Sequence, residues 1–179
     1  LKLRRQLQNE LRRIHRETGT TFLFVTHDQE EALHLSDRIA IMRGGHIEQL
    51  ADPETIYLHP ANAFIADFVG DVSFLNAETE PDGVRLAGGA FLPWKLDRAP
   101  GPVRIAVRPE DIGIAPRGEP GTLDATVMQM AYEPGATLYT LRLGVAEVRA
   151  RVLGLAGGAL RPGEAVGLRL GQRLMAFDR

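Results

Sequence analysis

The sequence contains no cysteine, so the chain can form neither disulfide bonds nor thiolate metal sites. It has no apolar run of the roughly 20 residues that a membrane-spanning helix needs, and its polar, arginine-rich start is no secretory signal peptide. Neither sign of charge dominates, because 21 Lys and Arg stand against 23 Asp and Glu, a net charge of −2. Such a chain has no global positive field, so we expect no nucleic-acid partner.

The length and composition allow one or two globular domains. The chain has 179 residues, of which 44% are hydrophobic, enough to bury a core. Four of the five histidines (His15, His34, His46 and His59) stand at no recognisable metal-ligand spacing from other histidines or carboxylates. We therefore expect no metal site.

The most informative stretch is Thr21 to Leu33, TFLFVTHDQEEAL. Phe22 to Val25 form a short apolar, β-branched run that predicts a strand buried on both faces of a covered sheet. His27 stands at the end of this run. Asp28 is a suitable N-cap for a helix with two acidic residues in its first turn. This places an imidazole at the carboxyl end of a strand, where open α/β sheets carry their ligand chemistry.

VTHDQEEA followed by LSDRIAIMRGGHIEQ resembles the switch-histidine segment of ATP-binding cassette (ABC) transporter ATPases. The matching residues are Val25, Thr26, His27, Asp28, Gln29, Glu31, Ala32, Leu35, Asp37, Arg38 and Ile39. The resemblance implies that His27 is a catalytic residue that contacts the γ-phosphate of ATP and helps to hold the attacking water. It also implies ATP and Mg²⁺ as cofactors of the intact protein. The chemistry fits, because phosphoryl transfer depends mainly on positioning and electrostatic stabilisation.

Other parts of such an ATPase are absent from the sequence. There is no GxxxxGK[ST] loop to cradle phosphates and no hydrophobic strand ending in Asp-Glu to hold magnesium. The LSGGQ-type signature of the family is missing as well. We expect that this chain alone binds no cofactor and does not hydrolyse ATP. Since it begins at Leu1 without methionine, we also expect it to be the later part of a longer polypeptide.

Residues 1–70 read as helices around a hairpin. Helical spacing of Leu and Ile predicts a helix over residues 1–17, and Gly44-Gly45 predicts a hairpin of 38–43 with 46–50. Asp52-Pro53 begins a short helix, and residues 61–69 form another. This passage resembles the exit segment of importer ATPases. We therefore interpret 1–70 as the C-terminal part of a nucleotide-binding domain, an α/β remnant of a P-loop fold.

Residues 71–179 have a different amino-acid pattern, in which glycine and proline recur between short β-rich runs. This pattern predicts a small all-β barrel. The predicted strands cover 72–77, 84–86, 103–107, 123–130, 137–143, 147–153, 166–170 and 174–177. Val107 to Asp111 resembles the IRPE-type element of the transport-associated OB-fold (TOBE) domain. Arg108, Pro109 and Glu110 form this motif, to which we assign a structural role, pinning a strand end to a neighbouring segment.

The resemblance implies the cytoplasmic ATPase subunit of an ABC importer, peripheral on the inner face of the cell membrane. Its partners would be transmembrane permease subunits, a second copy of the ATPase subunit in a homodimer and, indirectly, an extracytoplasmic solute-binding protein. The transported solute (iron, polyamine, phosphonate or sugar) stays open. Two other functions also stay open: a stand-alone OB-type module that binds small oxyanions, and a dimerisation module.

Overall fold

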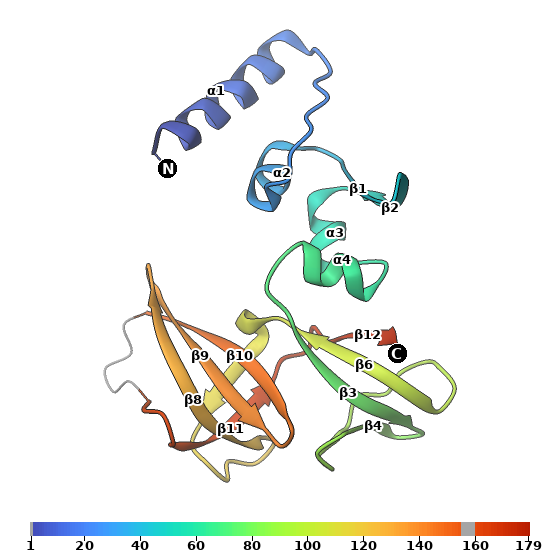
Figure 1. Ribbon diagram of the computed structural model, residues 1–179, viewed down its shortest axis with the longest axis vertical. Coiled ribbons are helices and arrows are strands. Elements are labelled where there is room, and N and C mark those ends of the chain that lie inside the picture. The colour runs from blue at the N-terminus through green and yellow to red at the C-terminus, as the bar shows by residue number, and fades with distance from the viewer. Residues whose placement is uncertain (1, 155–159) are drawn as a thin grey trace. The chain divides into compact units, whose positions relative to one another are not determined.

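The computed structural model describes residues 2–154 and 160–179, and Leu1, where the first predicted helix was to begin, lies outside them. The chain divides into two compact units, Leu1–Gly70 and Asp71–Arg179 (Figure 1). Each unit has a hydrophobic cluster of its own. No helix in the described part of the chain is long and apolar enough to cross a membrane.

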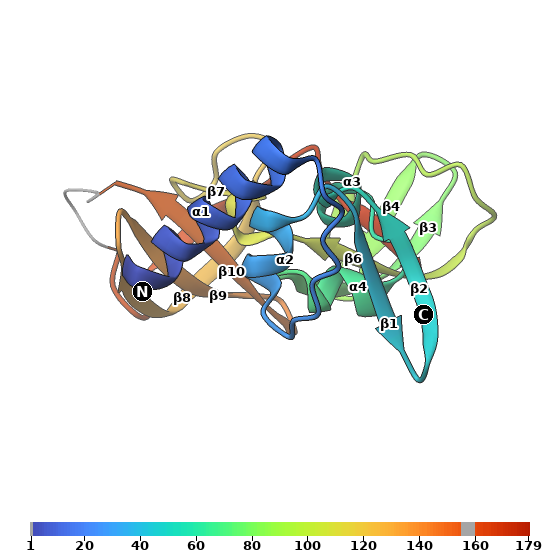
Figure 2. The ribbon, with the colours of Figure 1, turned by 90° about the horizontal axis from the view of Figure 1, so that it is seen from above.

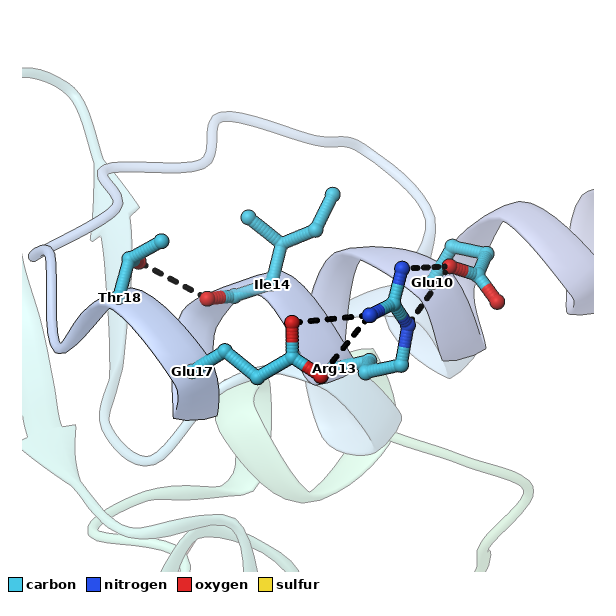
Figure 3. A network of polar contacts seen from close by, with 5 residues as sticks. All are labelled: Glu10, Arg13, Ile14, Glu17 and Thr18. Carbon is cyan, nitrogen blue, oxygen red and sulfur yellow. Dashed lines mark hydrogen bonds and ion pairs between the residues drawn. The ribbon is translucent and has the colours of Figure 1, made fainter.

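The first unit begins with helix α1, Lys2–Thr18, which ends where Gly19 adopts a positive φ of 63°. Arg13 pairs with Glu10 along this helix: Arg13 Nε donates to Glu10 Oε2 at 3.0 Å. Arg13 Nη1 also donates to Glu17 at 2.8 Å (Figure 3). Hydrogen bonds from Glu17 and then Glu10 raise the pKa of Arg13. This face of α1 is therefore held by exposed ion pairs.

From residue 28 to residue 70 the first unit follows the sequence prediction closely. Its elements are α2 (Gln29–Leu35), β1 (Ile39–Arg43), β2 (His46–Ala51), α3 (Pro53–Leu58) and α4 (Ala63–Phe68). β1 and β2 form the expected antiparallel hairpin, visible in Figure 2, and its turn uses Gly44 and Gly45 at φ 57° and 84°. The unit's core contains Ile39, Ile41, Ile56, Ile65 and Val69.

The prediction of a buried strand over residues 22–25 is wrong. The segment is an irregular extended stretch with no strand pairing, and Leu23 and Val25 are 93% and 89% exposed. A strand buried on both faces needs neighbouring strands and covering helices. The first unit offers only the β1–β2 hairpin, which pairs with itself. Within the described residues this unit has no parallel strands, so the α/β character of the expected P-loop remnant stays a prediction.

The second unit contains two five-stranded antiparallel sheets. One has the order β10-β9-β8-β11-β7 and the other the order β12-β6-β3-β4-β5 (Figure 1). The strand bounds are β3 (Ser73–Glu80), β4 (Gly83–Leu86), β5 (Phe91–Leu92), β6 (Gly101–Val107), β7 (Ile112–Ala115), β8 (Leu123–Glu133), β9 (Ala136–Leu143), β10 (Ala146–Leu153), β11 (Ala165–Leu170) and β12 (Met175–Asp178). A short 3₁₀ helix, η1 (Pro109–Asp111), joins β6 to β7.

The all-β character of this unit is confirmed, but its architecture differs from one small barrel. The outer strands β7 and β10 of the first sheet contact each other, so that sheet is curled. In the second sheet β6 pairs with β3 on one side and, on the other, with β12, from the far end of the unit. A single core joins the inner faces of both sheets, with Leu75 and Ile105 on one side and Leu141, Val148 and Leu168 on the other. Strand runs in a sequence do not specify which distant strands pair, and this accounts for the difference.

Candidate functional site

His27, the residue singled out by the sequence, lies at an exposed bend immediately before α2. The preceding residues are extended and exposed, so His27 does not stand at the end of a sheet strand as expected. Within the described part of the chain its ring makes no hydrogen bond. An imidazole N–H that is exposed in this way can donate a hydrogen bond to a phosphate oxygen.

A small network fixes the backbone on both sides of His27. Thr26 Oγ1 accepts a hydrogen bond from the Asp28 N–H at 3.0 Å and donates to Glu31 Oε2 at 2.8 Å. Asp28 Oδ1 in turn accepts from the Glu31 N–H at 3.1 Å, the N-cap bond of α2. Thr26 and Asp28 are partly buried, whereas His27 between them is exposed. The network therefore presents the imidazole outward from a constrained turn.

Sequence reasoning predicted the Asp28 cap but not the role of Thr26 and Glu31. The available signal was Asp28 followed three residues later by Glu31, the spacing of a capping box. In a capping box the Glu side chain reaches back to the N-cap N–H, and here Glu31 Oε2 accepts a hydrogen bond from the Thr26 hydroxyl. Gln8 Nε2 donates to the other oxygen of Glu31 at 3.4 Å, so the network also reaches α1.

The TOBE-like motif lies in the second unit, where β6 passes into η1. Arg108 is only 2% exposed, and its Nη1 donates to the Asp71 carbonyl oxygen at 3.3 Å. Pro109 is buried at the first position of η1, and Glu110 is exposed beside it. The Asp111 N–H donates to the Arg108 carbonyl oxygen at 3.0 Å. Arg108 thus ties the end of β6 to the residue at which the second unit begins.

His27 and Arg108 belong to different units, and we treat them as separate sites. Among residues 2–154 and 160–179, no group of three or more His, Asp or Glu side chains lies close enough together to hold a metal ion.

The second unit also has a groove of about 890 Å³, between the β4–β5 turn, residues 118–124 and the β9–β10 turn. The charged side chains lining it are Glu119, Asp124 and Glu147, all acidic. Glu119 pairs with Arg169, and Asp124 pairs with Arg117 at 3.7 Å. Carboxylates repel anions, so this groove gives no support to an oxyanion-binding module.

Comparison with known proteins finds a family match within the second unit. Residues 105–177 match the TOBE domain family. Arg108, Pro109 and Glu110, the residues of the TOBE-like motif, fall inside this match.

Over most of its length the chain is also similar to the C-terminal region of ABC importer ATP-binding subunits. It is 44% identical to the spermidine/putrescine import ATP-binding protein PotA of Rubrobacter xylanophilus over 178 residues, which cover 93% of this chain and 47% of that protein. It is 40% identical to PotA of Pseudomonas fluorescens over 80% of this chain and 42% of that protein. It is 41% identical to the sn-glycerol-3-phosphate import ATP-binding protein UgpC of Jannaschia sp. over 66% of this chain and 35% of that protein.

The chain spans less than half the length of each of these relatives. Among solved structures, the cytoplasmic molybdate-binding protein ModG with molybdate bound aligns with a TM-score of 0.45 and 18% identity, over 60% of this chain and 94% of that chain. A likeness of this degree carries no inference about ligands.

Proposed function

We propose that this chain is part of the ATP-binding subunit of an ABC importer, in which ATP binding and hydrolysis are coupled to solute uptake. Residues 1–70 are the C-terminal part of its nucleotide-binding domain, and residues 71–179 are its TOBE regulatory domain. The proposal rests on the similarity to importer ATP-binding subunits over 93% of the chain. The exposed His27 in its constrained turn is the chemical feature that supports it.

In this proposal His27 senses the terminal phosphate of ATP. Its imidazole donates a directional hydrogen bond to a γ-phosphate oxygen and helps to orient the attacking water. The Thr26–Asp28–Glu31 network contributes by fixing the backbone turn that carries His27. Because this turn is already ordered, little conformational entropy is lost when the reaction occurs. Residues that cradle the phosphates and hold Mg²⁺ do not occur in this sequence, so the activity belongs to the longer protein.

The proposed partners and location are those expected for the ATP-binding subunit of an ABC importer. Two ATP-binding subunits close over ATP, and this closure drives transmembrane permease subunits between their two states. An extracytoplasmic solute-binding protein delivers the solute on the far side of the membrane. The subunit itself is cytoplasmic and peripheral on the inner face of the membrane. Two of the relatives described above are named for spermidine and putrescine import, which supports a polyamine as the solute.

The decisive experiment replaces His27 by alanine in the intact protein. We expect ATP binding close to that of the wild type and turnover lowered by about 100-fold or more, because the lost group acts on the transition state. Filter binding of nucleotide and phosphate release measure the two quantities. His34→Ala is the matched control, since His34 is an exposed histidine of α2 whose Nδ1 lies 2.7 Å from the Glu30 carbonyl oxygen. Near-normal turnover of His27→Ala, or equal losses in both variants, would refute the role of His27.

A further inference from the structure

The junction between the two units is held tightly on both sides of one residue. On the first unit's side, α4 ends with the Val69 N–H donating to the Ile65 carbonyl oxygen at 3.0 Å. The Val69 side chain is 5% exposed and packs in the first unit's core with Ile56 and Ile65. The chain is therefore anchored to the first unit as far as residue 69.

On the second unit's side, three arginines converge on Asp71. Arg149 Nη1 lies 3.1 Å from Asp71 Oδ1, and Arg151 Nη2 lies 3.9 Å from Asp71 Oδ2. The buried Arg108 donates to the Asp71 carbonyl oxygen. We call Asp71 with these three residues the arginine clamp. Because Arg149 and Arg151 come from β10 and Arg108 from the β6–η1 junction, the clamp fixes both the side chain and the backbone of Asp71.

The residues after Asp71 are fixed as well. Ser73 begins β3 opposite Val107 of β6. The Ser73 hydroxyl also accepts a hydrogen bond from the backbone N–H of Arg149 at 3.0 Å. From Asp71 onward the chain is thus part of the second unit.

Gly70 is the one residue between these two anchored segments. Glycine reaches more of φ/ψ space than any other residue, and hinge motions are absorbed by a few such positions at element ends. We propose that rotation between the two units occurs at Gly70 and that the arginine clamp confines it to that residue. When the clamp is loosened, Asp71 also becomes free to rotate, so the hinge extends into the second unit. β10 then no longer fixes the direction in which the chain enters that unit.

The Asp71 pairs are partly exposed, so salt weakens them. This gives the clamp a signature that simple packing lacks. We expect exchange of the Val72 and Ser73 amides to rise by about two- to fivefold when the pairs are lost, the range of a few exposed ion pairs.

The test uses the full 179-residue chain, whose lack of cysteine allows clean labelling. Spin labels at Glu54→Cys and Asp82→Cys, both exposed and in different units, give the distribution of inter-unit distances. Hydrogen exchange is measured on the same variants without labels. Asp71→Asn opens the clamp, and Gly70→Ala restricts the hinge. Asp124→Asn is the matched control, because Asp124 also pairs with an arginine in the second unit.

Asp71→Asn should broaden the distance distribution and speed exchange at residues 72 and 73, whereas Gly70→Ala should narrow the distribution and leave that exchange unchanged. The labelled chain with Asp71 and Gly70 intact, placed in 1 M salt, should approach Asp71→Asn in both measurements, and this comparison needs no substitution in the clamp or at the hinge. The proposal is overturned if high salt and Asp71→Asn leave both measurements as in the wild type. It is also overturned if Asp124→Asn reproduces the Asp71→Asn change, or if Gly70→Ala leaves the distribution unaltered.

Discussion

Three short polar side chains begin helices of the first unit by accepting the same type of hydrogen bond. Asp28, Asp52 and Asn62 each accept from the backbone N–H three residues later. The N-cap roles of Asp28 and Asp52 were predictable, because a cap depends on residue type and on neighbours in sequence. Asn62 was missed, since the apolar run made the helix appear to begin at Ala61.

Asp52 gives the clearest dependence on pH. Hydrogen bonds from the Thr55 N–H at 2.9 Å and the Thr55 hydroxyl at 2.7 Å lower the pKa of Asp52. A carboxylate whose pKa is lowered by folding stabilises the native state above its unfolded pKa of about 3.9. This contribution is lost as the pH falls through the folded pKa. Asp52→Asn keeps a capping oxygen but cannot titrate, so its stability should fall less steeply than that of the wild type between about pH 5 and pH 2.

Urea unfolding followed by far-UV circular dichroism measures this difference, because the described α-helices all belong to the first unit. Asp67→Asn serves as the control, since it removes an exposed carboxylate of the same unit outside α3. If the stability of the wild type and of Asp52→Asn fell equally steeply as the pH is lowered, the assigned role of the cap would be contradicted.

Strands were predicted well where the sequence has a β-rich run bounded by turn residues. They were predicted poorly where the formation of a strand depends on the presence of a pairing partner. All eight predicted runs of the second unit correspond to strands. β5, with two residues, was missed because so short a segment shows no periodicity, and β7, with four, was missed although β4 and β12, which are equally short, were predicted. The run 22–25 has the strongest local β signal and is not a strand, because the residues that would pair with it are not among the described elements.

The β4–β5 pair depends on a close backbone approach at Gly83. A Cβ atom at this position would lie 2.2 Å from the Leu92 carbonyl oxygen and 2.6 Å from the Phe91 ring. Gly83→Ala should therefore displace β5 and destabilise the second unit by about 1–3 kcal/mol, the usual cost of overpacking. Thermal unfolding followed by the fluorescence of Trp94, which packs against the second unit's core, measures the effect.

Gly88→Ala is the matched control for this variant. The atom nearest to its added Cβ is the Gly144 Cα at 3.5 Å, an ordinary van der Waals distance. We expect Gly88→Ala to change stability far less than Gly83→Ala. Equal effects would mean that the close approach at Gly83 relaxes without displacing β5.

Among residues 2–154 and 160–179 the hydrophobic side chains form two cores, one in each unit. Leu141 is fully buried in the second, where residues of both sheets meet, so Leu141→Ala should cost about 2–5 kcal/mol. We expect hydrogen exchange to lose protection in both sheets of the second unit while the β1–β2 hairpin is unaffected. Ile56→Ala should have the reverse effect, because Ile56 is fully buried in the first core. Parallel loss of protection in both units would contradict separate cores.

For the whole molecule, the sequence predicted the type of secondary structure better than it predicted which strands pair. The all-β character of residues 71–179 follows from turn residues and alternation, both of which are local. The pairing of β12 with β6 joins residues about 70 positions apart in sequence and leaves no local pattern. The arginine clamp is invisible for the same reason, since Arg108, Arg149 and Arg151 reach Asp71 only in three dimensions. The proposal of His27 as a site residue rests on its neighbours in sequence alone, and its exposure was not predicted.

The exposed stretch Thr21–Val25 affects how the isolated chain behaves in solution. Its five residues carry no charge and no proline, they belong to no helix or strand, and the apolar side chains of residues 22–25 are exposed to solvent. Short segments of this kind stack between molecules into intermolecular sheets. Purified preparations should consequently become turbid as concentration rises, and a charged residue at position 23 should improve their solubility.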